Sequence, residues 1–150
     1  MGMDIPDYPL YPGVRLRLSR SNFERLTAEA RARAPHEACG LIAGTDEDGA
    51  ISIREVFMLT NTDHNSEHFT IDPREQLQAV KRMRELGLRP LGNWHSHPAT
   101  PARPSQEDIR LAYDRQAIYC ILSLAASEPD LRAYHIEDGT VTRFELDILP

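Results

Sequence analysis

The sequence predicts a single domain that contains both helices and strands. Its 150 residues lie within the usual size range of one domain, and the chain has no internal repeat and no linker long enough to divide it. Segments that alternate apolar and polar residues, as half-buried strands do, occur between segments with the apolar spacing of helices. The composition, 41% hydrophobic and 27% charged, is that of an ordinary globular protein, so one packed core is expected.

Residues 1–13 are predicted to be an irregular N-terminal lead-in to the domain, which spans residues 14–150. Three prolines and a glycine near its end favour turns and loops in this lead-in. The next five residues, 14–18, alternate apolar and basic side chains and are predicted to form the first strand.

A helix and a β-hairpin are expected next. Ser19 or Ser21 can cap a helix that runs to about Ala34, and its alanine-rich interior supports this prediction. An apolar strand over 38–44 and an alternating strand over 51–57 flank a turn rich in acidic residues and glycine. We therefore expect these two strands to pair as a hairpin.

The second helix has a clear start and stop. Asp72 can cap it, Pro73 suits the first helical position, and Glu75 can reach back to the cap. Gly87 is expected to end it. Its buried stripe is predicted to consist of Leu77, Val80 and Met83.

The C-terminal half is predicted to be mostly strands. One proline-rich loop, 98–104, leads into a short helix that begins at Ser105. Residues 117–124 are nearly all apolar, which is typical of a strand buried on both faces, and Asp138-Gly139 suits a tight hairpin turn. The strands expected in this half are 91–97, 117–124, 131–136 and 141–148.

Charge and composition argue against several classes of partner. The formal net charge of −6 gives no long-range attraction to nucleic acid. The longest nearly apolar run, 117–126, is too short to span a bilayer, and the N-terminus lacks the basic patch and apolar run of a secretion signal. Cys39 and Cys120 lie in apolar stretches, so a disulfide is not indicated and the cytoplasm is the expected compartment.

The strongest chemical signal is a histidine pair followed by an aspartate. His95 and His97 stand two apart on a predicted strand, so both imidazoles project from one face and can converge on one cation. Zinc accepts neutral histidine nitrogens, and a carboxylate is a common third ligand in sites that keep a position for water. Asp108 can supply it, because the intervening prolines restrict the loop that returns it to the strand. We therefore predict one Zn²⁺ per chain.

Simpler interpretations of these residues exist. Ser105 and Asp108 are three apart at a helix start and can form a capping pair. One of the two histidines can be a hydrogen-bonded core residue while the other is exposed. The capping pair is compatible with the metal site, since a cap would hold the aspartate in a fixed orientation.

Hydrolysis at such a metal also needs a carboxylate that carries a proton from water to the leaving group. Glu37 and Glu55 are the main candidates. Glu37 stands at the entry to an apolar strand, where a carboxylate without a partner would be costly. Glu55 fits an ordinary solvent-facing strand position. Glu37 is therefore preferred.

These residues together resemble the signature of the JAMM, or MPN-domain, metallopeptidases: a glutamate, then His-x-His, seven residues, serine, two residues and aspartate. The matching residues are Glu37, His95, His97, Ser105 and Asp108. The flanking segments 37–44 and 94–98 are also similar to that family. The resemblance extends over about residues 14–148.

The resemblance implies an α/β fold like that of cytidine deaminases, with a mixed, curved β-sheet flanked by helices. It also implies that His95, His97 and Asp108 bind zinc, that Glu37 is the general acid/base, and that Ser105 helps to hold the oxyanion. The chain is most similar to short bacterial members of the family that process ubiquitin-like sulfur-carrier proteins. These either expose a terminal Gly-Gly or release an amino acid such as cysteine.

That substrate implies a groove for an extended tail, which would bind by adding a strand to a sheet edge. Loops 61–68 and 98–104 are expected to flank this groove, and His64 and His68 are interpreted as polar loop residues. Cys39 is interpreted as a small core residue.

Three rival functions have different sequence requirements. A non-catalytic MPN scaffold would not need the complete set of five residues. A metal-binding interaction domain would bind zinc without hydrolysis. A zinc nucleobase deaminase would need H-x-E followed by P-C-x-x-C, which two distant cysteines do not provide.

Overall fold

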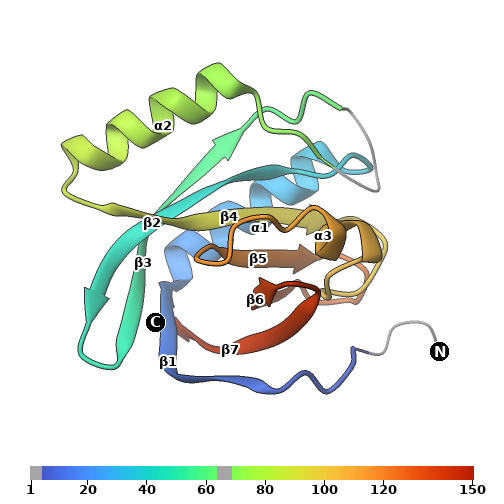
Figure 1. The fold of residues 1–150 in the computed structure, drawn as a ribbon. Coiled ribbons are helices and arrows are strands. Elements are labelled where there is room, and N and C mark those ends of the chain that lie inside the picture. Colours follow the sequence, from blue (N-terminus) through green and yellow to red (C-terminus); the bar gives the residue numbers. More distant parts are fainter. Residues whose placement is uncertain (1–4, 64–68) are drawn as a thin grey trace.

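The computed structural model describes residues 5–63 and 69–150, and within them the chain forms seven strands and three helices (Figure 1). The first half contains β1 (Leu10–Ser19), α1 (Arg20–Arg33), β2 (Cys39–Glu47), β3 (Ala50–Leu59) and α2 (Pro73–Glu85). The second half contains β4 (Arg89–His97), α3 (Gln106–Arg110), β5 (Ile118–Ser123), β6 (Asp130–Glu137) and β7 (Thr140–Leu149).

The strands form one mixed sheet that closes on itself. Their order is β1-β3-β2-β4-β5-β6-β7, and β1 returns to pair with β7. The pairs β1–β3, β1–β7 and β4–β5 are parallel and the remaining four are antiparallel. The predicted single-domain α/β fold with a mixed, curved sheet is confirmed. Strand twist closes the sheet through the pairs that β1 makes with β7 and β3, and β1 pairs with β3 only from Arg15 to Leu18. The specific likeness to cytidine deaminases stays a prediction.

The two faces of the sheet are covered by different elements. Leu26 and Ala30 of α1 pack with inward-facing residues of the sheet, including Trp94 of β4, in the largest apolar cluster. On the outer face, Ala79 and Met83 of α2 cover part of β2. Because side chains alternate along a strand, the neighbours of Trp94 in β4 point to the outer face.

The outer face also carries α3 and the loop before it. Ile109 of α3 and Ala102 of the loop pack on Ile121 and on the β6–β7 hairpin. The figure shows α3 in front of the sheet, away from α1 (Figure 1). The C-terminal end of β4 thus lies beside the start of α3.

Most element boundaries agree with the sequence predictions. Ser19 is the N-cap of α1 and accepts a hydrogen bond from the backbone N–H of Asn22 at 3.1 Å. In the last hairpin, Asp138 and Gly139 both have positive φ, 50° and 81°, as a tight two-residue turn requires. β1 begins at Leu10, four residues before the predicted start, and its register with β7 shifts between Leu10 and Arg15.

Two predictions for α2 were wrong. Asp72 caps the helix, but the side chain of Glu75 accepts from Thr60 rather than reaching back to the cap. Leu77 is 57% exposed, and Ala79 lies in the interface instead. The buried face of α2 depends on its contacts with Leu41 and Ala43 of β2, which the spacing of its apolar residues does not determine.

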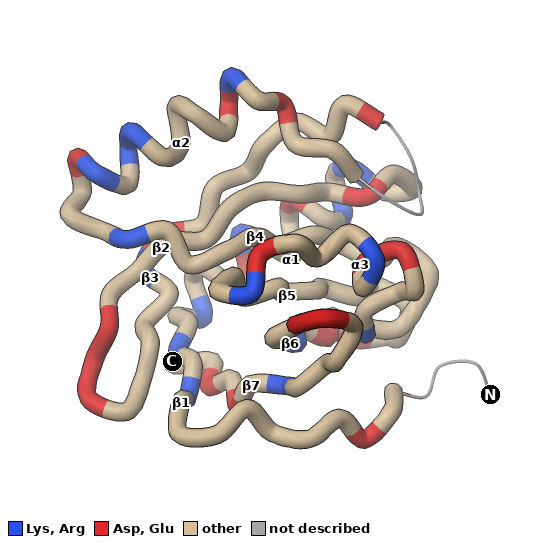
Figure 2. The backbone as a smooth tube through the Cα atoms, in the orientation of Figure 1, with Lys and Arg blue, Asp and Glu red and all other residues tan. Residues whose placement is uncertain are grey.

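Charged residues are spread over the molecule. Lys and Arg are distributed along the whole backbone among acidic residues, without a continuous basic face in this view (Figure 2). The helices of the described residues are all too short or too polar to cross a membrane.

Candidate metal centre

The histidine pair lies at the C-terminal end of β4 on its outer face. His95 is opposite Cys39 in the antiparallel β2–β4 pair, and β5 lies along the other side of β4. Both imidazoles are buried, with His95 2% and His97 4% exposed. The alternative that one histidine is buried and the other exposed is therefore wrong.

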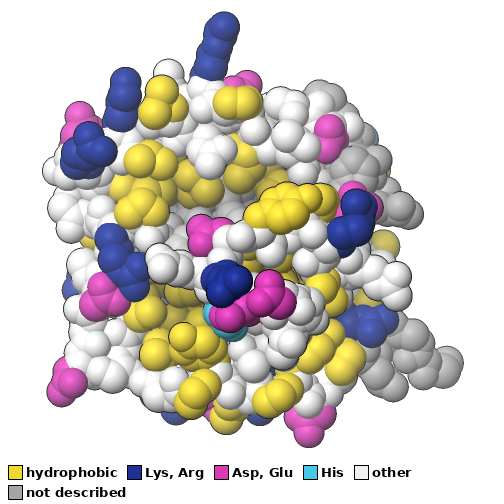
Figure 3. Space-filling view, in the orientation of Figure 1, with side chains coloured by type: hydrophobic (Ala, Val, Ile, Leu, Met, Phe, Trp, Pro, Cys, Tyr) yellow, Lys and Arg dark blue, Asp and Glu magenta, His cyan; other side chains and the backbone are white. Residues whose placement is uncertain are grey.

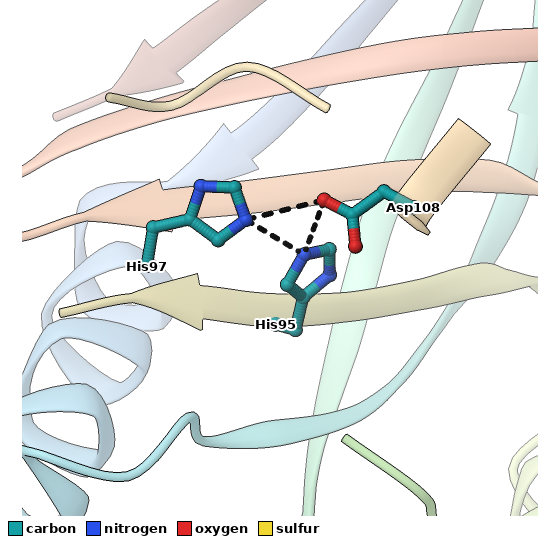
Figure 4. Close-up of side chains that lie close together, drawn as sticks. All are labelled: His95, His97 and Asp108. Atoms are coloured by element: carbon teal, nitrogen blue, oxygen red, sulfur yellow. Dashed lines mark hydrogen bonds and ion pairs between the residues drawn. The ribbon is translucent and has the colours of Figure 1, made fainter. Parts of the chain in front are cut away.

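Three donor atoms meet at one point. The Nε2 atoms of His95 and His97 are 3.2 Å apart, and the Oδ2 atom of Asp108 lies 3.3 Å from the first and 3.2 Å from the second. Figure 4 shows the two imidazoles from β4 and the carboxylate from α3 pointing toward one another. In the described part of the chain, these residues form the one group that could hold a metal ion.

The spacing of these atoms fits zinc. Tetrahedral zinc with bonds of about 2.0–2.1 Å to nitrogen and oxygen separates its ligand atoms by about 3.3 Å. The three observed separations are 3.2–3.3 Å. The donor set, two imidazoles and one carboxylate, is also one that catalytic zinc sites use.

A backbone contact determines the tautomer of His97. Its Nδ1 lies 2.8 Å from the carbonyl oxygen of Pro101, so Nδ1–H donates to that carbonyl and Nε2 keeps its lone pair. This lone pair faces the Asp108 carboxylate at 3.2 Å. Two acceptors at this distance need a positive charge between them, either a proton or a metal ion.

His95 is oriented by stacking. The ring of Phe69 lies 4.7 Å from its ring at an angle of 27°. The Nδ1 atom of His95 is buried and has no hydrogen-bond partner in the described chain. Sequence reasoning missed both Phe69 and Pro101: the first is one aromatic residue in a short extended segment, and the second acts through its backbone.

A capping box positions Asp108. The Ser105 hydroxyl accepts from the Asp108 backbone N–H at 2.9 Å, and Asp108 Oδ2 accepts from the Ser105 backbone N–H at 2.9 Å. The predicted capping pair is thus confirmed, and the oxygen that it orients is the one that faces the histidines. Burial raises the pKa of Asp108, but the positive charge of His95 and the hydrogen bonds from His95, His97 and Ser105 outweigh it and lower that pKa well below its usual value.

Glu37 is also buried. Its exposure is 2%. Ser96 N–H donates to the Ala38 carbonyl at 2.9 Å, so the β2–β4 pairing extends beyond Cys39 and brings Glu37 opposite His97. Residues opposite each other in an antiparallel pair project from the same face. Glu37 is thus on the face of the histidines.

Glu55, the other candidate base, is engaged elsewhere. Its carboxylate accepts from Arg25 of α1 at 2.9 Å and from the backbone N–H of Val56 at 3.1 Å. It lies opposite Ala43, four residues along β2 from Cys39. The structure therefore separates Glu55 from the histidines.

Cys39 is a buried core residue, as predicted. Its Sγ atom lies 3.7 Å from the carbonyl oxygen of Leu59. Burial, followed by the negative charge of Glu37, raises the pKa of the thiol to about 12. A neutral thiol is a poor ligand for a metal.

A pocket of about 230 Å³ opens beside the three donor atoms. His95 and Asp108 form part of its wall, and most of the remainder is apolar. The other lining residues are Phe69, Asn93, Glu107, Leu111, Tyr119, Ile121 and Ile136. On this face of the molecule, hydrophobic side chains gather in patches between charged ones (Figure 3). Half of the predicted groove, the loop 61–68 with His64 and His68, lies largely outside the described residues.

Several known proteins are similar to this chain. A family model described as prokaryotic homologs of the JAB domain matches residues 19–137. The chain is 33% identical over 125 residues to the CysO-cysteine peptidase of Mycobacterium tuberculosis, which covers 83% of this chain and 84% of that protein. It is 36% identical over 104 residues to a probable TtuB-protein conjugate cleaving protease of Thermus thermophilus. This match covers 68% of this chain and 66% of that protein.

A solved structure is also similar. The solution structure of a protein from Desulfitobacterium hafniense matches with a TM-score of 0.82 and 45% sequence identity, and the match covers 89% of this chain and 92% of that one.

Proposed function

This chain belongs to the family of prokaryotic JAB domains, and from that premise we propose that it is a zinc metallopeptidase of the JAMM type. Its proposed substrate is a ubiquitin-like sulfur-carrier protein. The proposed reaction is hydrolysis of a peptide or isopeptide bond at the carrier's C-terminus, which exposes Gly-Gly or releases an amino acid such as cysteine.

The observation that carries this proposal is the convergence of the three donor atoms. Side chains from β4 and α3 place two imidazole nitrogens and one carboxylate oxygen within 3.2–3.3 Å of one another. His95, His97 and Asp108 would hold the zinc ion. When bound, zinc polarises a carbonyl group and makes water more acidic.

The other two residues of the signature have proposed roles in proton transfer and charge stabilisation. Glu37, on the face of the histidines, would take a proton from water and give it to the leaving amine. The Ser105 hydroxyl accepts the Asp108 N–H in the cap, and this contact does not use its own hydrogen. That hydrogen would donate to the oxyanion, a contribution worth about 2.7–4 kcal/mol in other hydrolases.

The choice of substrate is supported by the relatives and by the pocket. One relative is named for cleavage of CysO-cysteine and the other for cleavage of TtuB conjugates. The narrow, partly apolar pocket beside His95 suits an extended tail better than a folded surface. In this proposal the tail lies in this pocket.

Two rivals differ from this proposal in what they predict. An MPN scaffold or a metal-binding interaction domain would share the fold but would hydrolyse neither a peptide bond nor an isopeptide bond of the carrier. The complete set of five signature residues, with three of them converged, favours the enzyme. The cytoplasm is the proposed compartment, where free thiols such as the two buried cysteines are normal.

The test is incubation of the zinc-loaded protein with a sulfur-carrier protein that bears a C-terminal extension after Gly-Gly, followed by intact mass measurement. A second arm uses the same carrier joined to a lysine side chain. We expect a mass loss equal to the extension or to the lysine partner, and no loss after zinc removal with a chelator. Tight zinc binding with both substrates intact would favour a non-catalytic domain.

A further inference from the structure

Arg103 is an unusual arginine in this structure. It lies in the loop before α3, is half-buried, and makes no side-chain hydrogen bond or ion pair with the described residues. The other two half-buried arginines are both engaged: Arg17 donates to Glu47 at 3.2 Å and Arg143 donates to the carbonyl of Tyr8 at 3.1 Å. A partly desolvated guanidinium without a partner is costly, so Arg103 is available to an anion.

Arg103 lines a second pocket that also borders the metal ligands. This pocket has a volume of about 300 Å³ and shares no lining residue with the pocket beside His95. It is lined by His97, Thr100, Pro101, Arg103, Pro104, Ser105 and Gln106. If a peptide bond is cleaved next to His97 and Ser105, the part of the substrate on one side of that bond would thus lie in reach of Arg103.

The two pockets differ in charge. The pocket beside His95 contains two carboxylates, Glu107 and Asp108, and neither lysine nor arginine. The second pocket contains Arg103 and no acidic residue. A peptide whose chain ends in a free carboxylate therefore fits with that end in the second pocket and with its preceding residues in the first.

The loop that carries Arg103 is held in place. The Arg103 backbone N–H donates to the Pro101 carbonyl at 2.8 Å, and the same carbonyl accepts from His97. Pro101 and Pro104 on either side restrict the backbone. Little conformational entropy is therefore lost when the guanidinium binds a ligand.

We propose that Arg103 binds the α-carboxylate of the substrate's last residue, so that the enzyme selects substrates with one short C-terminal residue to release. This inference rests on the proposed peptidase function and names the feature of the substrate that the site recognises. Guanidinium binds a carboxylate through two parallel hydrogen bonds, which suits a terminal carboxylate. An internal isopeptide bond has no such group near the scissile carbonyl.

The test compares two carrier substrates that end in Gly-Gly-X, one with a free C-terminal carboxylate and one with a C-terminal carboxamide. The kcat/KM ratio of acid to amide is measured for the wild type and for the variants Arg103→Gln and Arg103→Lys. Arg84→Gln is the matched control, because Arg84 is exposed on α2 and has the same charge. Binding of short peptides with the same two ends to the metal-free protein gives a readout that needs no turnover.

We expect the wild type and Arg84→Gln to prefer the acid by about ten- to a hundredfold, the range of a charge-assisted hydrogen bond. Arg103→Gln should reduce this ratio to about one, and Arg103→Lys should restore it in part. Equal use of acid and amide by the wild type, or an Arg103→Gln ratio equal to that of the wild type, would overturn the inference. If no carrier is cleaved but metal-free protein binds the acid peptide better through Arg103, the peptidase proposal fails and the carboxylate site stands. If no carrier is cleaved and the metal-free protein binds the acid and amide peptides equally, both the peptidase proposal and the carboxylate site fail.

Discussion

At the scale of single residues, the site is determined as much by backbone contacts as by side chains. The Pro101 carbonyl selects the tautomer of His97, and the Ser105 N–H holds the oxygen of Asp108 that faces it. Such second contacts raise the basicity of a ligand and restrict its orientation. They leave no recognisable pattern in the sequence, whereas the proposed ligands themselves do.

The role proposed for Glu37 leads to a prediction that separates metal binding from turnover. Glu37→Gln keeps the size of the side chain and removes the proton carrier, so we expect normal zinc content and a fall in kcat of at least a hundredfold. His97→Ala should lose both zinc and activity. Zinc content by mass spectrometry and turnover of the carrier are the measurements.

The control for this prediction is Glu55→Gln. Glu55 is the other candidate for the general base, and it pairs with Arg25 away from the histidines. This variant should retain turnover close to that of the wild type. Near-normal activity of Glu37→Gln together with loss in Glu55→Gln would reverse the assignment.

The two cysteines are expected to be unreactive in the native protein. Burial raises the pKa of Cys120 to about 12, and burial with the charge of Glu37 does the same for Cys39. A raised thiol pKa means that the fold favours the neutral form. The preference of the fold for the neutral thiols stabilises the protein fully below the ordinary thiol pKa of about 9. This contribution is lost as the pH rises toward the folded-state pKa of about 12.

A thiol reagent at pH 8 should therefore label the folded protein slowly and both cysteines rapidly after denaturation. Thermal stability should fall between pH 9 and 12. Rapid labelling of two thiols per chain at pH 8 without denaturant would show that one or both pKa values are not raised.

At the scale of elements, α3 is a short helix whose cap is part of the site. Ser105 and Asp108 satisfy each other's backbone N–H groups, and Asp108 thereby faces β4. Ser105→Ala removes one of these bonds, and we expect it to cost about 1 kcal/mol of stability. Because it also loosens Asp108, zinc affinity should fall by about 10- to 100-fold.

Ser19→Ala provides the matched comparison. Ser19 caps α1 with the same kind of bond, to the N–H of Asn22, and contacts no residue of the metal group. It should lose similar stability in chemical denaturation and keep its zinc affinity in a competition titration. Equal zinc affinities of the two variants would show that the cap does not position Asp108.

The elements also show where sequence reasoning succeeds. The serine cap of α1, the Asp138-Gly139 turn and the capping box of α3 depend on residues close in the chain, and all three were predicted. The exposure of Leu77 was not predicted, because the face that α2 buries depends on its contacts with β2. The three proposed ligands were predictable because strand spacing and helix start are both local features.

At the scale of the whole molecule, closure of the sheet depends on contacts between the two ends of the chain. β1 pairs in parallel with β7 from Leu10 to Ser19, although more than a hundred residues separate them. Nothing in either strand identifies the other. The family resemblance implied a mixed, curved sheet, but its closure could not be predicted from the sequence.

An ion pair across this closing contact gives a prediction about pH. Arg15 of β1 donates two hydrogen bonds to Asp147 of β7, at 3.1 and 3.0 Å, and these bonds lower the pKa of Asp147. A lowered pKa means that the pair contributes stability above the ordinary aspartate pKa of 3.8 and loses it as the pH falls through the lower folded value. The contribution is small because both side chains are exposed to solvent.

We therefore expect Asp147→Asn to have a slightly lower melting temperature than the wild type at pH 6, measured at low salt. The difference should shrink as the pH falls below 4 and as salt screens the pair. His95 and His97 of β4 and Asp108 of α3 lie outside the β1–β7 pair, so zinc binding at pH 7 should be the same in both proteins. A melting-temperature difference that is constant from pH 6 to pH 2 would show that Asp147 acts through packing of β7 rather than through its charge.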